Sequence, residues 1–116
     1  MRSADDPDDA LSSVLAGLAV SARQANLARS DVVAAALDAL AAGRLEEADR
    51  ATAEQAAHQV VGSAGTFGAQ RASELAASLE HYLSSDEAAR VSGLTQAQAE
   101  LAELRRELRA DHQVEE

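Results

Sequence analysis

Apolar residues recur at three- and four-residue intervals along most of the chain, in stretches separated by glycine or by short polar segments. This spacing places the apolar side chains on one face of an α-helix. It predicts helical segments at residues 8–42, 45–66 and 69–83, and a last helix that carries Leu94, Ala97, Leu101, Leu104 and Leu108. The first segment is one long helix or two shorter ones, because Ser30-Asp31 offers a second N-cap within it.

Residues that start or stop helices stand between these segments. Asp6 followed by Pro7 predicts the start of the first helix, since Asp caps and Pro fits the first turn. Gly43 predicts its end, and Phe67-Gly68 predicts the next turn. The segment Ser84-Ser85-Asp86-Glu87 has the Ser-x-x-Glu spacing of a capping box. We expect Leu11, Val14, Leu15, Leu18 and Ala22 to continue the apolar spacing of the first helix through Gly17.

Short connections between amphipathic helices favour antiparallel neighbours. We therefore predict an all-α protein, an antiparallel up-and-down four-helix bundle with an additional or extended N-terminal helix. The predicted domain spans residues 7–110. Residues 1–6 are expected to be a disordered N-terminus and residues 111–116 a flexible acidic C-terminus.

Composition narrows the function classes. The formal net charge of −10 argues against binding to nucleic acid or to an anionic membrane. The chain has no cysteine, which removes disulfides and thiolate metal sites, and no histidine pair has ligand spacing. No apolar run approaches the roughly 20 residues of a membrane span. We expect a cytoplasmic monomer without a metal or cofactor of its own.

The segment around His58 carries the candidate chemistry. At about 100° per residue, His58 points away from the predicted buried stripe of its helix. That stripe consists of Leu45, Ala48, Ala53, Ala56, Val60, Ala64 and Phe67. Gly62 and Gly65 flank His58 one and two turns further on, where each costs roughly 1 kcal/mol relative to alanine. Either bare backbone there lets a partner approach the ring, or the glycines only end the helix; geometry alone leaves both open.

The residues themselves resemble a known family. Ala57-His58, Gly62-Ser63-Ala64 and Phe67-Gly68-Ala69, followed by Leu75, Leu79 and Glu80, are similar to the motif of the histidine-containing phosphotransfer (HPt) domains of bacterial phosphorelays. The resemblance is close from residue 57 to residue 80.

This resemblance implies that His58 accepts a phosphoryl group and exchanges it with the aspartate of a receiver domain. The chain would be a phosphoryl carrier rather than an enzyme, and its partners would be a response-regulator receiver domain, a histidine kinase, or both. The receiver would supply Mg²⁺ and the acceptor aspartate. The docking surface would be formed by Gln55, His58, Gln59, Val61, Gly62 and Gly65.

One position departs from the family pattern. The family has a lysine three residues after the histidine, thought to support the phosphoryl oxygens, and this chain has Val61. The alternative is therefore a degenerate HPt-like domain that binds a receiver or kinase without carrying phosphate. A third possibility is a structural helical bundle without a signalling partner.

The other residues near His58 in the sequence have individual interpretations. Gln55 lies one turn before His58 and could hydrogen-bond the ring or a phosphoryl oxygen, and Glu54 would disfavour added negative charge there. Arg50 and Arg71 are the nearest basic residues, but we expect both to be ordinary surface charges. Ser63 is expected to pack toward a neighbouring helix, and Phe67 to belong to the core.

Overall fold

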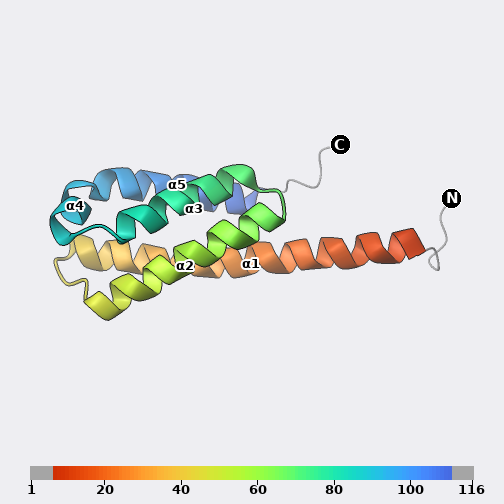
Figure 1. The fold of residues 1–116 in the computed structure, drawn as a ribbon, viewed down its shortest axis with the longest axis horizontal. Helices are drawn as coiled ribbons and strands as arrows, with labels where there is room; N and C mark the ends of the chain where they lie inside the picture. Colours follow the sequence, from red (N-terminus) through yellow and green to blue (C-terminus); the bar gives the residue numbers. More distant parts are fainter. Residues whose placement is uncertain (1–6, 111–116) are drawn as a thin grey trace.

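The computed structural model describes residues 7–110, and within that range it contains helices and no strands. The helices are α1 (Pro7–Ala41), α2 (Glu47–Thr66), α3 (Gln70–Leu83), α4 (Glu87–Ser92) and α5 (Leu94–Arg109). The predicted all-α class and up-and-down four-helix bundle are confirmed, with α4 as a short connecting helix (Figure 1). The predicted ends, 1–6 and 111–116, and the predicted cap Asp6 lie outside the described residues.

The core lies between α1, α2, α3 and α5. Each of these helices packs on the two beside it, which closes a four-membered ring around one interior. The largest fully buried side chains are Val33, Leu37, Val60, Leu79, Leu83 and Leu104. Alanines fill the positions of closest approach, and Ala53 and Ala76 are 0% exposed. The apolar stripe predicted for the last helix, which is α5, packs into this core, with Leu94 partly buried and the other four residues buried.

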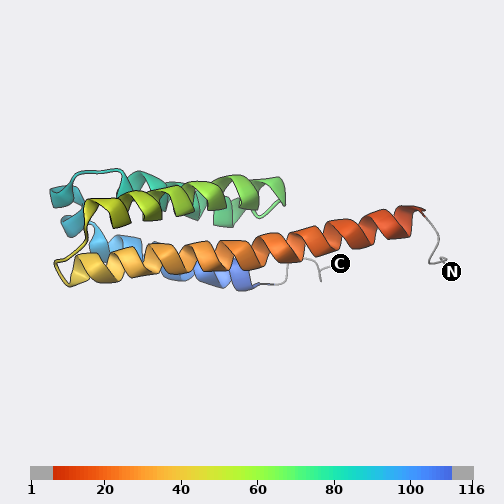
Figure 2. The ribbon, with the colours of Figure 1, turned by 90° about the horizontal axis from the view of Figure 1, so that it is seen from below.

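α1 is a single helix of 35 residues rather than two. Ser30 does not cap a second helix, because it is 0% exposed and its Oγ donates to the Leu27 carbonyl at 2.6 Å. The N-terminal part of α1 extends beyond the other helices (Figure 2). Its apolar stripe, Leu11, Val14, Leu15 and Leu18, is 51–58% exposed. The helical spacing was correct, but α2 and α5 end too early to cover this stripe.

Glycine makes two of the connections. Gly43 after α1 and Gly68 after α2 adopt φ of +73° and +79°, the left-handed region that favours glycine. The predicted capping box at residues 84–87 is wrong: Asp86 is the N-cap of α4, and its carboxylate accepts from the Ala89 N–H at 2.9 Å. A carboxylate one residue before the first helical turn takes this role directly.

Two residues of the stripe predicted for α2 are exposed, and a third, Leu45, is partly buried and lies before the helix begins. Ala48 lies in the first turn of α2, at an exposed end of the bundle. Phe67 is 43% exposed because it is the C-cap residue of α2, where the chain leaves helical geometry. Ala57, absent from the predicted stripe, is 1% exposed.

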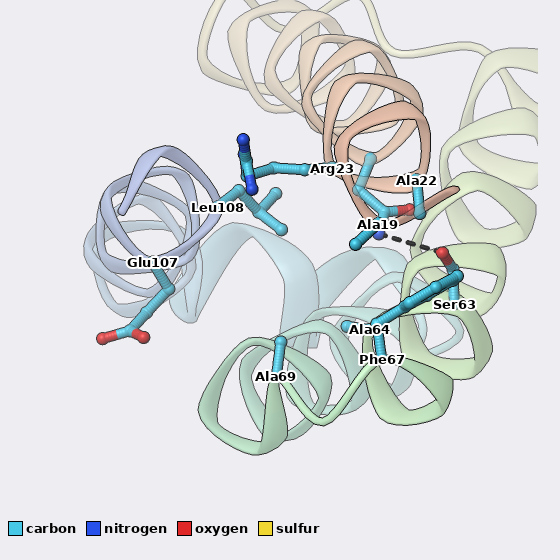
Figure 3. Close-up of a pocket in the computed structure, with 10 residues that line it drawn as sticks. Ala19, Ala22, Arg23, Ser63, Ala64, Phe67, Ala69, Glu107 and Leu108 are labelled. Carbon is cyan, nitrogen blue, oxygen red and sulfur yellow. Dashed lines mark hydrogen bonds between the residues drawn. The ribbon is translucent and has the colours of Figure 1, made fainter. Parts of the chain in front are cut away.

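A buried hydrogen bond joins α1 to α2. Asn26 is 2% exposed, and its Nδ2 donates to Ser63 Oγ at 3.1 Å (Figure 3). Ser63 therefore faces a neighbouring helix as predicted, with a specific polar partner there. Because buried amides are costly without partners, this contact favours one register between the two helices.

Candidate functional site

His58 stands on the outer face of α2, near the middle of the helix. Its side chain is 64% exposed, whereas the neighbouring Ala57 and Val60 are 1% and 0% exposed. The predicted outward orientation is observed. The rigid, fully paired middle of a helix holds the Cα of His58, so a partner meets the ring in one defined position.

Glu80 of α3 contacts one side of the ring. His58 Nδ1 lies 2.9 Å from Glu80 Oε2. An ionised carboxylate can only accept hydrogen bonds, so Nδ1 is the donor. In the neutral ring this tautomer leaves the lone pair on Nε2. The contact therefore orients the imidazole and assigns the nucleophilic nitrogen.

The surface beside His58 is polar and open at one glycine. Gln55 and Gln59 are exposed on α2. A Cβ added at Gly62 would meet nothing within 4 Å, whereas one added at Gly65 would lie 3.5 Å from Ser73 Oγ of α3. Gly62 therefore belongs to the open surface, and Gly65 lies where α2 and α3 pass closely.

Val61 is not part of the open surface. Its side chain is half-buried against the core, and its carbonyl accepts from Ser73 Oγ at 2.9 Å. The position where the family has a lysine is therefore an apolar contact between α2 and α3.

The two arginines considered from sequence are bound to carboxylates. Arg50 pairs with Glu47 and Glu54 at 2.6 Å each, and its Nη1 donates to the Leu83 carbonyl at 2.9 Å. Its hydrogen bond with Glu47 is the main cause that raises the pKa of Arg50.

Arg71 is engaged in the same way. It pairs with Glu103 of α5 at 2.8 Å, and this hydrogen bond raises the pKa of Arg71. Both arginines therefore join elements of the bundle. The expectation of an ordinary surface charge is wrong for Arg50, whose side chain is only 15% exposed, whereas the side chain of Arg71 is 52% exposed.

Sequence reasoning missed a third arginine. Arg29 of α1 lines a groove between α1 and α2 together with Gln55 and Gln59. Its Nη1 donates to Asn26 Oδ1 at 2.8 Å, which ties it to the buried amide. In the sequence, Arg29 lies on the predicted first helix, 29 positions before His58, and nothing else there marks it as a neighbour of the site. It is the cation that borders the predicted docking surface.

Among residues 7–110, no three His, Asp or Glu side chains form a group that could hold a metal ion. Within the same range, no helix has the length and apolar character that crossing a membrane requires. The site thus consists of one exposed imidazole, one carboxylate that orients it, and a polar helix surface.

Comparison with known proteins gives one result. The family model of the Hpt domain matches residues 23–113. No curated protein and no solved structure matches the chain. Hpt domains are helical phosphocarrier modules that act in phosphorelays with receiver domains and kinases. Since the match covers most of the chain, and the four-helix bundle with an exposed histidine agrees with it, the protein belongs to the Hpt domain family.

Proposed function

We propose that the protein carries a phosphoryl group on Nε2 of His58 and exchanges it with the aspartate of a receiver domain. The observation that carries this proposal is the 2.9 Å contact between His58 Nδ1 and Glu80 on an otherwise exposed ring. It leaves Nε2 as the nitrogen with both a lone pair and free access. Family membership supplies the reaction class.

The transfer step follows from this tautomer. The Nε2 lone pair forms the new N–P bond while the bond between phosphorus and the receiver's aspartate oxygen breaks, and the carboxylate leaves with the electron pair. The ring then carries a positive charge and keeps its Nδ1 hydrogen. The Glu80 carboxylate, an acceptor for that hydrogen, stabilises the charge as it develops. The reverse sequence returns the phosphoryl group to a carboxylate.

The proposed docking surface surrounds this nitrogen. Gln55, Gln59 and Gly62 of α2 form its exposed part. Val61 and Gly65, predicted as members from the sequence, contribute through the shape of the helix where α2 meets α3. We propose Arg29, at the edge of this surface, as the group that can approach a bound anion in place of the family's lysine.

A second function is favoured by Val61. An apolar side chain packed on the core cannot support phosphoryl oxygens, and the loss of a cation removes electrostatic help from the transition state. On this hypothesis the domain binds a receiver or kinase without carrying phosphate. Cytoplasmic placement and the identity of the partner remain predictions.

Radiolabel transfer from a panel of phosphorylated receiver domains tests the two functions. We expect acid-labile label on the wild-type chain and none on His58→Gln. His81→Gln is the matched control, because His81 is an exposed histidine on the adjacent helix α3 and the same substitution there should leave the label in place. Equal labelling of wild type and His58→Gln would overturn the proposal. Receiver binding that survives His58→Ala, without labelling of the wild type, would select the degenerate domain.

A further inference from the structure

The N-terminal half of α1 presents an apolar face that nothing in the described chain covers. Leu11, Val14, Leu15 and Leu18 are 58%, 57%, 52% and 51% exposed. At about 100° per residue they fall within one third of the helix circumference. The Hpt match begins at residue 23, so this extension lies outside the segment that the family accounts for.

This face continues the core face of the same helix. Ala22 follows Leu18 by four residues, in the same stripe, and lines a cavity of about 150 Å³ at the end of the bundle (Figure 3). Phe67 and Leu108 line the cavity as well, and Phe67 is 43% exposed. The stripe and the open end of the bundle therefore form one continuous apolar surface. Monomers rarely expose contiguous apolar surfaces of this kind without a binding role.

We propose that this surface binds the same surface of a second copy, with the two α1 helices antiparallel. With Leu15 opposite Leu15, the first turn of one α1 lies beside residues 22 and 23 of the other. Asp8 then approaches Arg23 of the second copy, and at about 100° per residue both lie on the same edge of the stripe. Arg23 lines the cavity, and the ion pairs seen among residues 7–110 do not include it.

Charge selects this orientation over the parallel one. A parallel pair would place the acidic first turns, with Asp8 and Asp9, against each other, whereas the antiparallel pair places them on Arg23. The area also suits a dimer. Each side chain of the stripe exposes on the order of 100 Å². Two stripes, Phe67 and the cavity walls together reach roughly 1,000 Å², the lower limit of specific interfaces.

The sequence predicts a monomer, and the proposal replaces that expectation. A second copy would also stabilise the extension itself, because short helices without tertiary packing are marginal in water and Gly17 weakens this one further. The inference does not depend on phosphotransfer by His58.

Sedimentation equilibrium of the full chain from micromolar to submillimolar concentration tests the proposal. We expect a reversible dimer for the wild type and a monomer for Leu15→Asp combined with Leu18→Asp, with dimerisation weakened at least about 10-fold. If the aspartates unfold the extension, Leu15→Ala combined with Leu18→Ala tests the same surface, because alanine raises helix propensity. Val91→Asp is the matched control: Val91 is 59% exposed on α4, at the other end of the bundle, and this variant should dimerise like the wild type.

The orientation has its own test. Arg23→Glu should weaken the dimer, and adding Asp8→Arg and Asp9→Arg should restore it, because the charges are then exchanged across the interface. A wild type that stays monomeric throughout would overturn the proposal, and so would a dimer that survives both leucine variants. Failure of the charge exchange to restore the dimer would overturn the antiparallel arrangement.

Discussion

In the proposed function, Glu80 decides which nitrogen of His58 reacts. Its carboxylate accepts from Nδ1 and leaves Nε2 with the lone pair. Glu80→Ala should slow phosphoryl uptake by about 10-fold, the rate equivalent of roughly 1.4 kcal/mol. Glu80→Gln should recover part of this loss, because the amide oxygen still accepts from Nδ1. The measurements are the transfer rate and the ring tautomer by ¹⁵N NMR.

A merely structural role for Glu80 makes a different prediction. In that case Glu80→Ala would lower the unfolding midpoint while the tautomer and the rate per folded molecule stayed at their wild-type values. A Glu80→Ala variant with the wild-type tautomer would therefore contradict the assignment.

Asn26 is the second residue with a defined task. It is 2% exposed, donates to Ser63 at 3.1 Å and accepts from Arg29 at 2.8 Å. Asn26→Ala should lower the free energy of unfolding by about 1–3 kcal/mol, because it leaves polar partners unsatisfied at a helix interface. Gln24→Ala, at an exposed position of the same helix, should change it little. Urea denaturation measures both, and equal stabilities would rule out this role.

Single residues also show which features of the site the sequence predicts and which it does not. The outward direction of His58 follows from helical periodicity, and the structure agrees. The same periodicity placed Phe67 in the core. Helix geometry ends at that residue, so the rotation of about 100° per residue used for the prediction does not hold there. Asn26 and Arg29 were missed because nothing local in the sequence reports on a partner 37 residues away.

At the scale of elements, the α2–α3 hairpin builds the site. The pairs His58–Glu80 and Gly65–Ser73 are both symmetric about Ala69, at the turn between the two helices. Antiparallel helices joined by a tight turn bring residues at equal distances from the turn together. With the turn at Phe67-Gly68 predicted correctly, this symmetry could have identified Glu80 as the partner of His58 from the sequence.

Alanine substitution should have opposite effects on stability at Gly62 and at Gly68, two glycines of this hairpin. Gly62 is helical with open space around it, so Gly62→Ala should raise the free energy of unfolding by about 0.5–1 kcal/mol. Gly68 has φ of +79°, so Gly68→Ala should lower it by about 1–2 kcal/mol. Thermal unfolding followed by circular dichroism measures both. A destabilised Gly62→Ala would mean that Gly62 is not on an open surface.

Gly62 also tests the docking surface. Gly62→Glu places a long charged side chain one turn from His58 and should impair receiver binding while the bundle stays folded. Titration with a receiver domain measures the affinity, and circular dichroism checks the fold. Unimpaired binding would remove Gly62 from the docking surface, and an unfolded variant would contradict its exposed position.

At the scale of the whole molecule, two surfaces are separate. The proposed phosphoryl site lies midway along α2, and the proposed dimer surface lies on the extension of α1 and the end of the bundle. The bundle class was predictable because every core helix carries its own apolar stripe. The extended first helix was predicted as well, but the exposure of its apolar stripe was not, because periodicity shows which face is apolar but does not show whether another helix is long enough to cover it.

Because the two surfaces are separate, we expect phosphoryl uptake to be independent of dimerisation. Leu15→Asp combined with Leu18→Asp should take up label from a receiver at the wild-type rate, because neither residue belongs to the proposed docking surface. Label transfer at a concentration where the wild type is dimeric measures it. A large loss of rate in a folded variant would show that the two surfaces are coupled.

The most direct measurement locates the phosphoryl group itself. The wild-type chain, phosphorylated by a receiver domain, is analysed by ³¹P and ¹⁵N NMR with His58→Gln and His81→Gln as references. We expect one phosphohistidine, at Nε2 of His58, present in His81→Gln and absent in His58→Gln. A phosphoryl group on Nδ1 of His58, or on any other residue, would contradict it.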